Sequence, residues 1–109
     1  MLRVFEYYDN GFKKYQIEII HEDTPYSINV DYRDWNKSVI VDKLIRTKYS
    51  QDSVEAIINN HFINIAEWIE LKFKNKTLKF EDPEYEAFQG WRVLCKEWAS
   101  KALEEYPEV

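Results

Sequence analysis

The two histidines are the side chains of this sequence best suited to acid–base chemistry, because an imidazole titrates near neutral pH. His21 closes a segment of alternating apolar and polar residues, with Glu18 before it and Asp31 further along the chain. An imidazole held against one of these carboxylates would form a general acid–base pair. Nothing in the spacing requires the side chains to converge, so the simpler interpretation of His21 is a histidine at the rim of a sheet.

His61 lies within a helical apolar stripe, where a neutral imidazole needs a hydrogen-bond partner. No second histidine, cysteine or carboxylate lies three or four residues from it, so it lacks the companions of a metal ligand. The only cysteine, Cys95, falls on a predicted helix face, and no glycine-rich phosphate loop is present. We therefore expect no catalytic residues, no metal and no cofactor, and we interpret His61 as a core or interface histidine.

The composition describes an acidic protein. The 109 residues carry 15 basic and 20 acidic side chains, which gives a formal net charge of −5. Proteins that bind nucleic acids usually carry a basic excess that displaces counterions from phosphates, so we do not expect direct nucleic-acid binding. We also expect no membrane contact, because there is neither an apolar run of about 18 residues nor a secretory leader. A lone cysteine favours a cytoplasmic location.

The first third of the chain alternates apolar and polar residues, as half-buried strands do. Residues 2–8 and 12–20 flank "DNG" at 9–11, and Asn-Gly is the strongest short signal for a two-residue hairpin turn. After a polar break that ends in proline, residues 26–33 alternate again. We therefore predict a three-stranded antiparallel meander with one apolar face, which helices must cover.

The next segment is predicted to be a short helix. Ser38 can cap a helix over residues 39–49, whose apolar residues recur at helical spacing. Three β-branched residues in a row also favour a fourth strand through residues 39–42. The sequence alone leaves this alternative open.

Two longer helices are predicted to fill the rest of the chain. Ser50 or Asp52 can cap the first, which runs to about Phe73. Asp82 can cap the second, over residues 83–106. The first of these helices is expected to lean on the sheet with one apolar face, made of Val54, Ile57, Ile58, His61, Phe62, Ile65 and Ile69.

Together these patterns predict the α+β class. We expect one domain over residues 1–109, with strands within about 2–33 and helices within about 39–106. The N-terminal three-stranded antiparallel meander should pack against two or three C-terminal helices.

The stretches "LIRTKYSQDSVEAIINN" and "DPEYEAFQGWRVLCKEWASKAL" together carry one pattern: an Ile-Arg pair, Tyr-Ser, an acidic helix start with Ala-Ile, and an "EYEAF" element that ends in Cys-Lys. Its positions here are Ile45, Arg46, Tyr49, Ser50, Glu55, Ala56, Ile57, Glu84, Tyr85, Glu86, Ala87, Phe88, Cys95 and Lys96. This half of the chain resembles the C-terminal part of small proteins of phages and prophages, many of them encoded near tail genes. Such proteins mostly have no assigned activity, so the resemblance implies a setting rather than a mechanism.

The surplus of aromatic residues favours a non-enzymatic protein–protein interaction or accessory protein, and the resemblance implies a phage or mobile-element origin. Its partner would be another protein or a second copy of the chain. Tryptophan and arginine dominate binding hot spots, so the interface candidates are Trp35, Trp91, Arg92 and Trp98. The competing explanation for each tryptophan is burial in the core of this chain, which we favour for Trp98.

Two other functions stay open. An acidic chain can act as a decoy that occupies a nucleic-acid-binding protein, although a charge of −5 is mild for that role. A small-ligand binder or enzyme would need a carboxylate, such as Glu18 or Asp31, to meet His21 and form a histidine–carboxylate pair.

Overall fold

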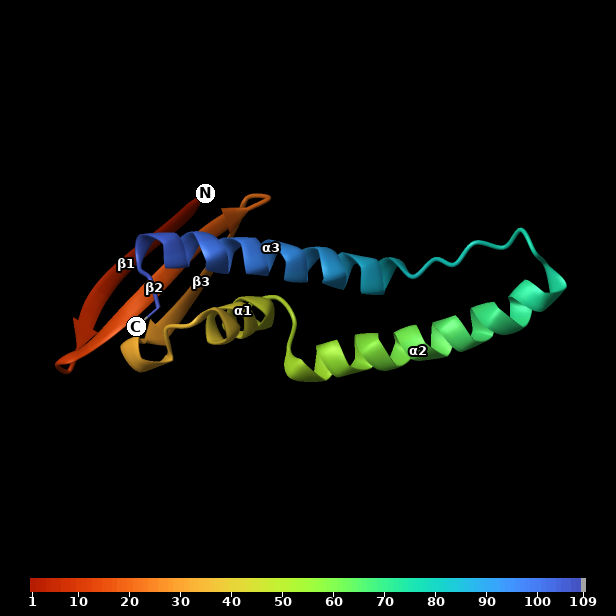
Figure 1. Ribbon diagram of the computed structural model, residues 1–109, viewed down its shortest axis with the longest axis horizontal. Helices are drawn as coiled ribbons and strands as arrows, with labels where there is room; N and C mark the ends of the chain where they lie inside the picture. The colour runs from red at the N-terminus through yellow and green to blue at the C-terminus, as the bar shows by residue number, and fades with distance from the viewer. Residues whose placement is uncertain (109) are drawn as a thin grey trace.

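Three strands precede three helices in the computed structural model of the protein, which describes residues 1–108 (Figure 1). The elements are β1 (Leu2–Asp9), β2 (Phe12–His21), β3 (Thr24–Asp31), a 3-10 turn (Tyr32–Asp34), α1 (Lys37–Arg46), α2 (Gln51–Lys74) and α3 (Pro83–Glu105). The strands form one antiparallel sheet in the order β1-β2-β3. The predicted α+β class and meander are confirmed.

Both hairpin turns place two residues in the left-handed region of backbone conformation. Asn10 and Gly11 have φ values of 52° and 81°, as expected from the Asn-Gly signal. In the second turn Glu22 and Asp23 have φ values of 49° and 62°, although neither residue is a glycine. The two turns set a register in which Ile17 lies between Val4 and Ile28, and these three side chains are buried on one face of the sheet.

The buried face of the sheet is covered by α1 and α3 (Figure 1). Three small side chains of α3, Cys95, Ala99 and Ala102, have no exposed surface and let this helix approach closely. Trp35, between the sheet and α1, stacks on Tyr15 with ring centroids 4.3 Å apart. One cluster of side chains from sheet and helices thus forms the main core.

The segment after the strands forms α1, so the alternative of a fourth strand through residues 39–42 is excluded. The cap is Asn36 rather than Ser38, because the Asn36 side chain accepts a hydrogen bond from the backbone N–H of Val39 at 3.0 Å. The other caps follow the sequence. Ser50 caps α2, and Asp82 caps α3.

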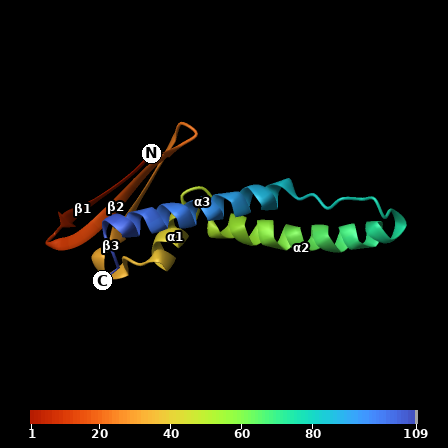
Figure 2. The same cartoon turned by 45° about the horizontal axis from the view of Figure 1, so that its top comes forward.

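α2 does not lean on the sheet as predicted but runs past its end (Figure 1). Its 24 residues span about 36 Å at the usual helical rise. The connector, residues 75–82, returns beside it toward α3 in both views (Figures 1 and 2). We call α2 and the connector the arm. None of the helices in residues 1–108 is long and apolar enough to cross a bilayer.

Candidate interaction surface

α2 carries two stripes of side chains, a mixed inner one and an apolar outer one, where the sequence predicted a single apolar face. The inner stripe, Ile57, His61, Asn64 and Trp68, faces α3 and the connector. Ile57 is buried, and the Trp68 ring meets Phe80 edge-on at 5.6 Å. Advancing each inner position by one residue, about 100° around the helix, gives the outer stripe. The outer stripe is Ile58, Phe62, Ile65 and Ile69, continued by Phe73.

The outer stripe has no covering element within residues 1–108. Phe62, Ile69 and Phe73 are 65%, 48% and 86% exposed, whereas Ile58 and Ile65 are half-buried. Single exposed apolar side chains are ordinary, but a contiguous row of large ones marks an interaction site. The steps of four, three and four residues are those of a seam that packs against a second helix.

The two ends of α2 carry opposite charges. Asp52 and Glu55 lie near its start, where acidic groups also suit the helix dipole. Lys72 and Lys74 lie in its last turn, and Lys76 follows in the connector. A helix bound along the outer stripe would therefore meet negative charge at one end and positive charge at the other.

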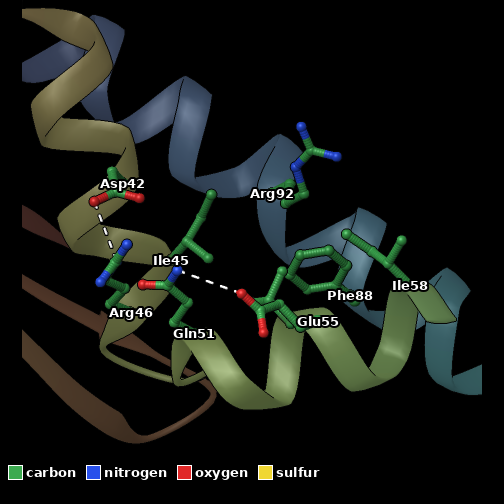
Figure 3. A pocket seen from close by; sticks show the side chains of 9 residues that line it. Asp42, Ile45, Arg46, Gln51, Glu55, Ile58, Phe88 and Arg92 are labelled. Carbon is green, nitrogen blue, oxygen red and sulfur yellow. Dashed lines mark hydrogen bonds and ion pairs between the residues drawn. The ribbon is translucent and has the colours of Figure 1, made fainter.

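A hollow of about 360 Å³ adjoins the start of the outer stripe, where α1, α2 and α3 meet (Figure 3). Ile45, Ile58 and Phe88 give it apolar walls, and Arg92 stands at its rim (Figure 3). Its complete lining is Asp42, Ile45, Arg46, Gln51, Val54, Glu55, Ile58, Phe88 and Arg92. A second, smaller hollow of about 230 Å³ lies near the tip of the arm and is lined by Trp68, Ile69, Lys72, Phe73 and Lys76.

The rim of the larger hollow is only partly neutralised. The Arg46 guanidinium pairs with Asp42 at 3.1 Å, one helical turn away on α1. The Gln51 amide donates a weak hydrogen bond to Glu55 at 3.4 Å. Arg92 donates to the Gln89 amide oxygen at 3.2 Å and lies 5.8 Å from the centre of the Phe88 ring. Arg92 thus finds a neutral partner, and an incoming carboxylate could still pair with it.

His61 has the partner that its apolar surroundings require, and the partner is Asp82. The His61 Nδ1 lies 2.8 Å from Asp82 Oδ2, and the Asn64 amide donates to the same oxygen at 3.1 Å. The Tyr85 ring stacks on the imidazole with centroids 3.5 Å apart. The hydrogen bonds from His61 and Asn64 lower the pKa of Asp82 below its ordinary value of 3.8. An ionised Asp82 only accepts, so Nδ1 carries the proton.

The cluster of His61, Asn64, Asp82 and Tyr85 fixes α2 to α3, and it contains no side chain positioned as a nucleophile. Asp82 Oδ1 also accepts the backbone N–H of Tyr85 at 3.3 Å, so one carboxylate caps α3 and fixes it to α2. His61 and Asp82 are 21 positions apart in the sequence, which explains why a search at helical spacing missed the pair. The extended connector brings the two together.

His21 does not form the acid–base pair considered from the sequence. Its ring lies between the sheet and α3, 5.4 Å from the Trp98 ring, and its only nearby carboxylate within residues 1–108 is the exposed Glu22 at 3.8 Å. Glu18 lies on the opposite face of the sheet and pairs with Arg3 at 2.8 Å. The Asp31 carboxylate accepts hydrogen bonds from the backbone N–H and the guanidinium of Arg33. Alternation along β2 separates His21 from Glu18.

The interface candidates named from the sequence mostly lie in the core. Trp35 and Trp91 are 2% and 3% exposed, so burial, the competing explanation, applies to both. Trp98 is half-buried and packs against the core, as we favoured. Arg92 borders the hollow between α1, α2 and α3, and Trp35 lines a separate hollow near the 3-10 turn. The exposed rings of the arm are Phe62 and Phe73, and the sequence analysis had assigned Phe62 to a buried face.

Comparisons with known proteins identify no relative of this chain. No protein-family model matches the chain, and searches of curated proteins and of solved structures find no similar one. Within residues 1–108, no three His, Cys, Asp or Glu side chains lie close enough together to hold a metal ion. The resemblance to phage proteins stays a prediction.

Proposed function

We propose that this protein is a non-enzymatic interaction module that binds a helix of another protein chain along the outer stripe of α2. The observation that carries the proposal is a row of large apolar side chains at the spacing of a helix-packing seam, of which Phe62, Ile69 and Phe73 are exposed and Ile58 and Ile65 half-buried. The row lies on an arm that extends away from the core. An accessory role in a phage or mobile element is part of the same proposal and rests on the resemblance alone.

The gain from binding is the removal of this apolar surface from water. Each large side chain contributes about 1.5–3 kcal/mol when it passes from full exposure to full burial, before the costs of association. Phe62, Ile69 and Phe73 have the most to bury. A helix with three or four aligned apolar anchors is the partner that this surface fits.

The arm can hold its shape while its outer stripe is unoccupied. The inner stripe is covered by α3 and the connector, and Asp82 ties both helices together. Lys72 donates from its ammonium group to the backbone oxygens of Lys76 at 2.7 Å and Leu78 at 3.0 Å, which fixes the return of the connector. A preformed surface spares a partner the cost of ordering it.

The test compares two aspartate substitutions on the same helix. Ile69 lies on the outer stripe, and Leu71, which is 53% exposed against 48% for Ile69, lies about 200° away around α2. The tagged chain would be recovered from the cells that produce it, and the bound proteins would be quantified by mass spectrometry. We expect I69D to lose a partner that the wild type and L71D retain, with all three chains equally folded by circular dichroism. Equal recovery by I69D and L71D would contradict the proposal.

A further inference from the structure

We propose that the helix bound by the outer stripe is α2 of a second copy of this chain, packed antiparallel to the first about a two-fold axis. The inference rests on the proposed function and names its partner. Two-fold pairing uses the same patch on both copies, so that patch must be complementary to itself. The apolar spacing of the outer stripe, the charges at the ends of α2 and the hollow between α1, α2 and α3 are each self-complementary in this way.

The outer stripes of two antiparallel α2 helices can be aligned so that Ile58, Phe62, Ile65 and Ile69 of each copy all contact the second copy. Ile58 of one copy faces Ile69 of the second, and Phe62 faces Ile65. The reciprocal pairs follow from the two-fold axis, which gives four consecutive apolar layers. In this register Phe62 and Ile69, both exposed in the single chain, become buried.

The charges decide between antiparallel and parallel packing. The seam continues three residues before Ile58 with Glu55 and three residues after Ile69 with Lys72. In the antiparallel register Glu55 of one copy lies opposite Lys72 of the second, at both ends of the apolar layers. The Lys72 ammonium also holds the connector through the backbone oxygens of Lys76 and Leu78, so the charges attract along the helix pair rather than as closed ion pairs. Parallel packing would place Glu55 against Glu55 and Lys72 against Lys72, which opposes association.

The larger hollow lies where this register needs space. Phe73, the most exposed large apolar side chain of the arm at 86%, falls opposite Val54 of the second copy. Val54 lines the 360 Å³ hollow, together with Ile45 and Phe88. The ring of Phe73 can therefore enter the apolar part of that hollow, and the adjacent Lys74 and Lys76 approach its acidic rim residues.

The shape of the chain permits this pairing. The sheet lies beyond the N-terminal end of α2, so antiparallel packing places the two sheets at opposite ends of the helix pair (Figure 1). The arm gives the single chain extents of 64 × 23 × 23 Å. Two arms lying side by side would thus meet along their length without bringing the sheets together.

The first experiment measures the mass of the purified chain by sedimentation equilibrium. We expect the wild type and L71D to approach twice the 13.3 kDa of one chain as the concentration rises. I69D should remain a monomer or weaken association by more than about a hundredfold, because it buries a charge between apolar layers. Circular dichroism of the three proteins verifies that each is folded.

The second experiment tests the register through charge reversal. E55K and K72E should each weaken self-association by about tenfold, because each creates two like-charge layers in its homodimer. An equimolar mixture of E55K and K72E should regain association, since both layers of the mixed dimer again join opposite charges. The double variant E55K/K72E should self-associate for the same reason. K72E also loses the hydrogen bonds from Lys72 to the connector, so urea unfolding of K72E is compared with that of K72M, which loses the same bonds without reversing the charge. Absence of rescue in the mixture, with K72E as stable as K72M, would contradict the antiparallel register.

The two proposals can fail separately. A wild-type chain that stays monomeric at every concentration up to about 1 mM would overturn the second-copy inference. The proposed function would survive that result if I69D, and not L71D, still lost a partner protein in cells. Equal association of I69D and L71D in both settings would overturn both proposals.

Discussion

Asp82 serves two helices with one carboxylate. It accepts hydrogen bonds from His61 and Asn64 of α2 and from the backbone of Tyr85 in α3. It is 6% exposed, and a buried carboxylate with fewer donors would be costly. The sequence indicated its role as a cap but not its contact with His61, because the connector decides that contact.

The depressed pKa of Asp82 predicts how it contributes to stability at different pH values. A carboxyl group whose pKa is lower in the folded chain contributes its full stabilisation above the unfolded value of about 3.8, and loses it as the pH falls through the folded pKa. The wild type should therefore be more stable than D82N at pH 5 in urea unfolding. That difference should shrink as the pH falls below about 4. A difference that stays constant down to about pH 2 would contradict this role.

Cys95 is predicted to be unreactive in the folded chain. It has no exposed surface, and its burial raises the pKa of the thiol to about 12. The thiolate, which is the nucleophile, is then scarce near neutral pH. Iodoacetamide at pH 8 should leave the native chain unmodified by mass spectrometry and modify it once in denaturant. Modification of the native chain at the rate of a free thiol would show that Cys95 is accessible.

At the scale of elements, the sequence predicted what is decided locally. Alternation predicted the strands and Asn-Gly the first turn. The start of α2 was predicted at Ser50 or Asp52, of which Ser50 is the cap, and the start of α3 at Asp82. The two stripes of α2 were not separable, because seams shifted by one residue merge into one broad apolar face. Which seam is covered depends on where α3 and the connector lie, and periodicity carries no information about that.

The two stripes should differ in their contribution to folding. Ile57 of the inner stripe is 5% exposed, so I57A should lower the free energy of unfolding by about 2–4 kcal/mol. Ile69 of the outer stripe is 48% exposed, so I69A should change it by less than about 0.5 kcal/mol in dilute monomer. Urea unfolding monitored by tryptophan fluorescence measures both. Equal losses would mean that Ile69 belongs to the core of its own chain.

At the scale of the whole molecule, the chain is more extended than its length requires. Its radius of gyration is 18.2 Å, against about 13 Å for a compact domain of 109 residues. The arm accounts for this difference, because the sheet, α1 and α3 form the only large core among residues 1–108. The extended arm leaves apolar side chains exposed to water that a compact fold would bury. Binding of another chain along the arm would bury them.

The extended shape should persist when association is prevented. Small-angle X-ray scattering of the I69D variant at low concentration should give a radius of gyration near 18 Å. L71D diluted to the monomer provides the matched control. A value near 13 Å would show that the arm folds back on the core and that its outer stripe is covered within the chain.

Photo-crosslinking along α2 tests the central claim most directly. A photoreactive amino acid would be placed in turn at the outer-stripe positions 58, 62, 65 and 69 and at the off-stripe positions 63, 67 and 71, in the cells that produce the protein. The account predicts discrete adducts with another protein chain, a second copy included, from the outer-stripe positions and none from the others. Adducts that ignore this periodicity, or an outer stripe that yields none, would contradict it.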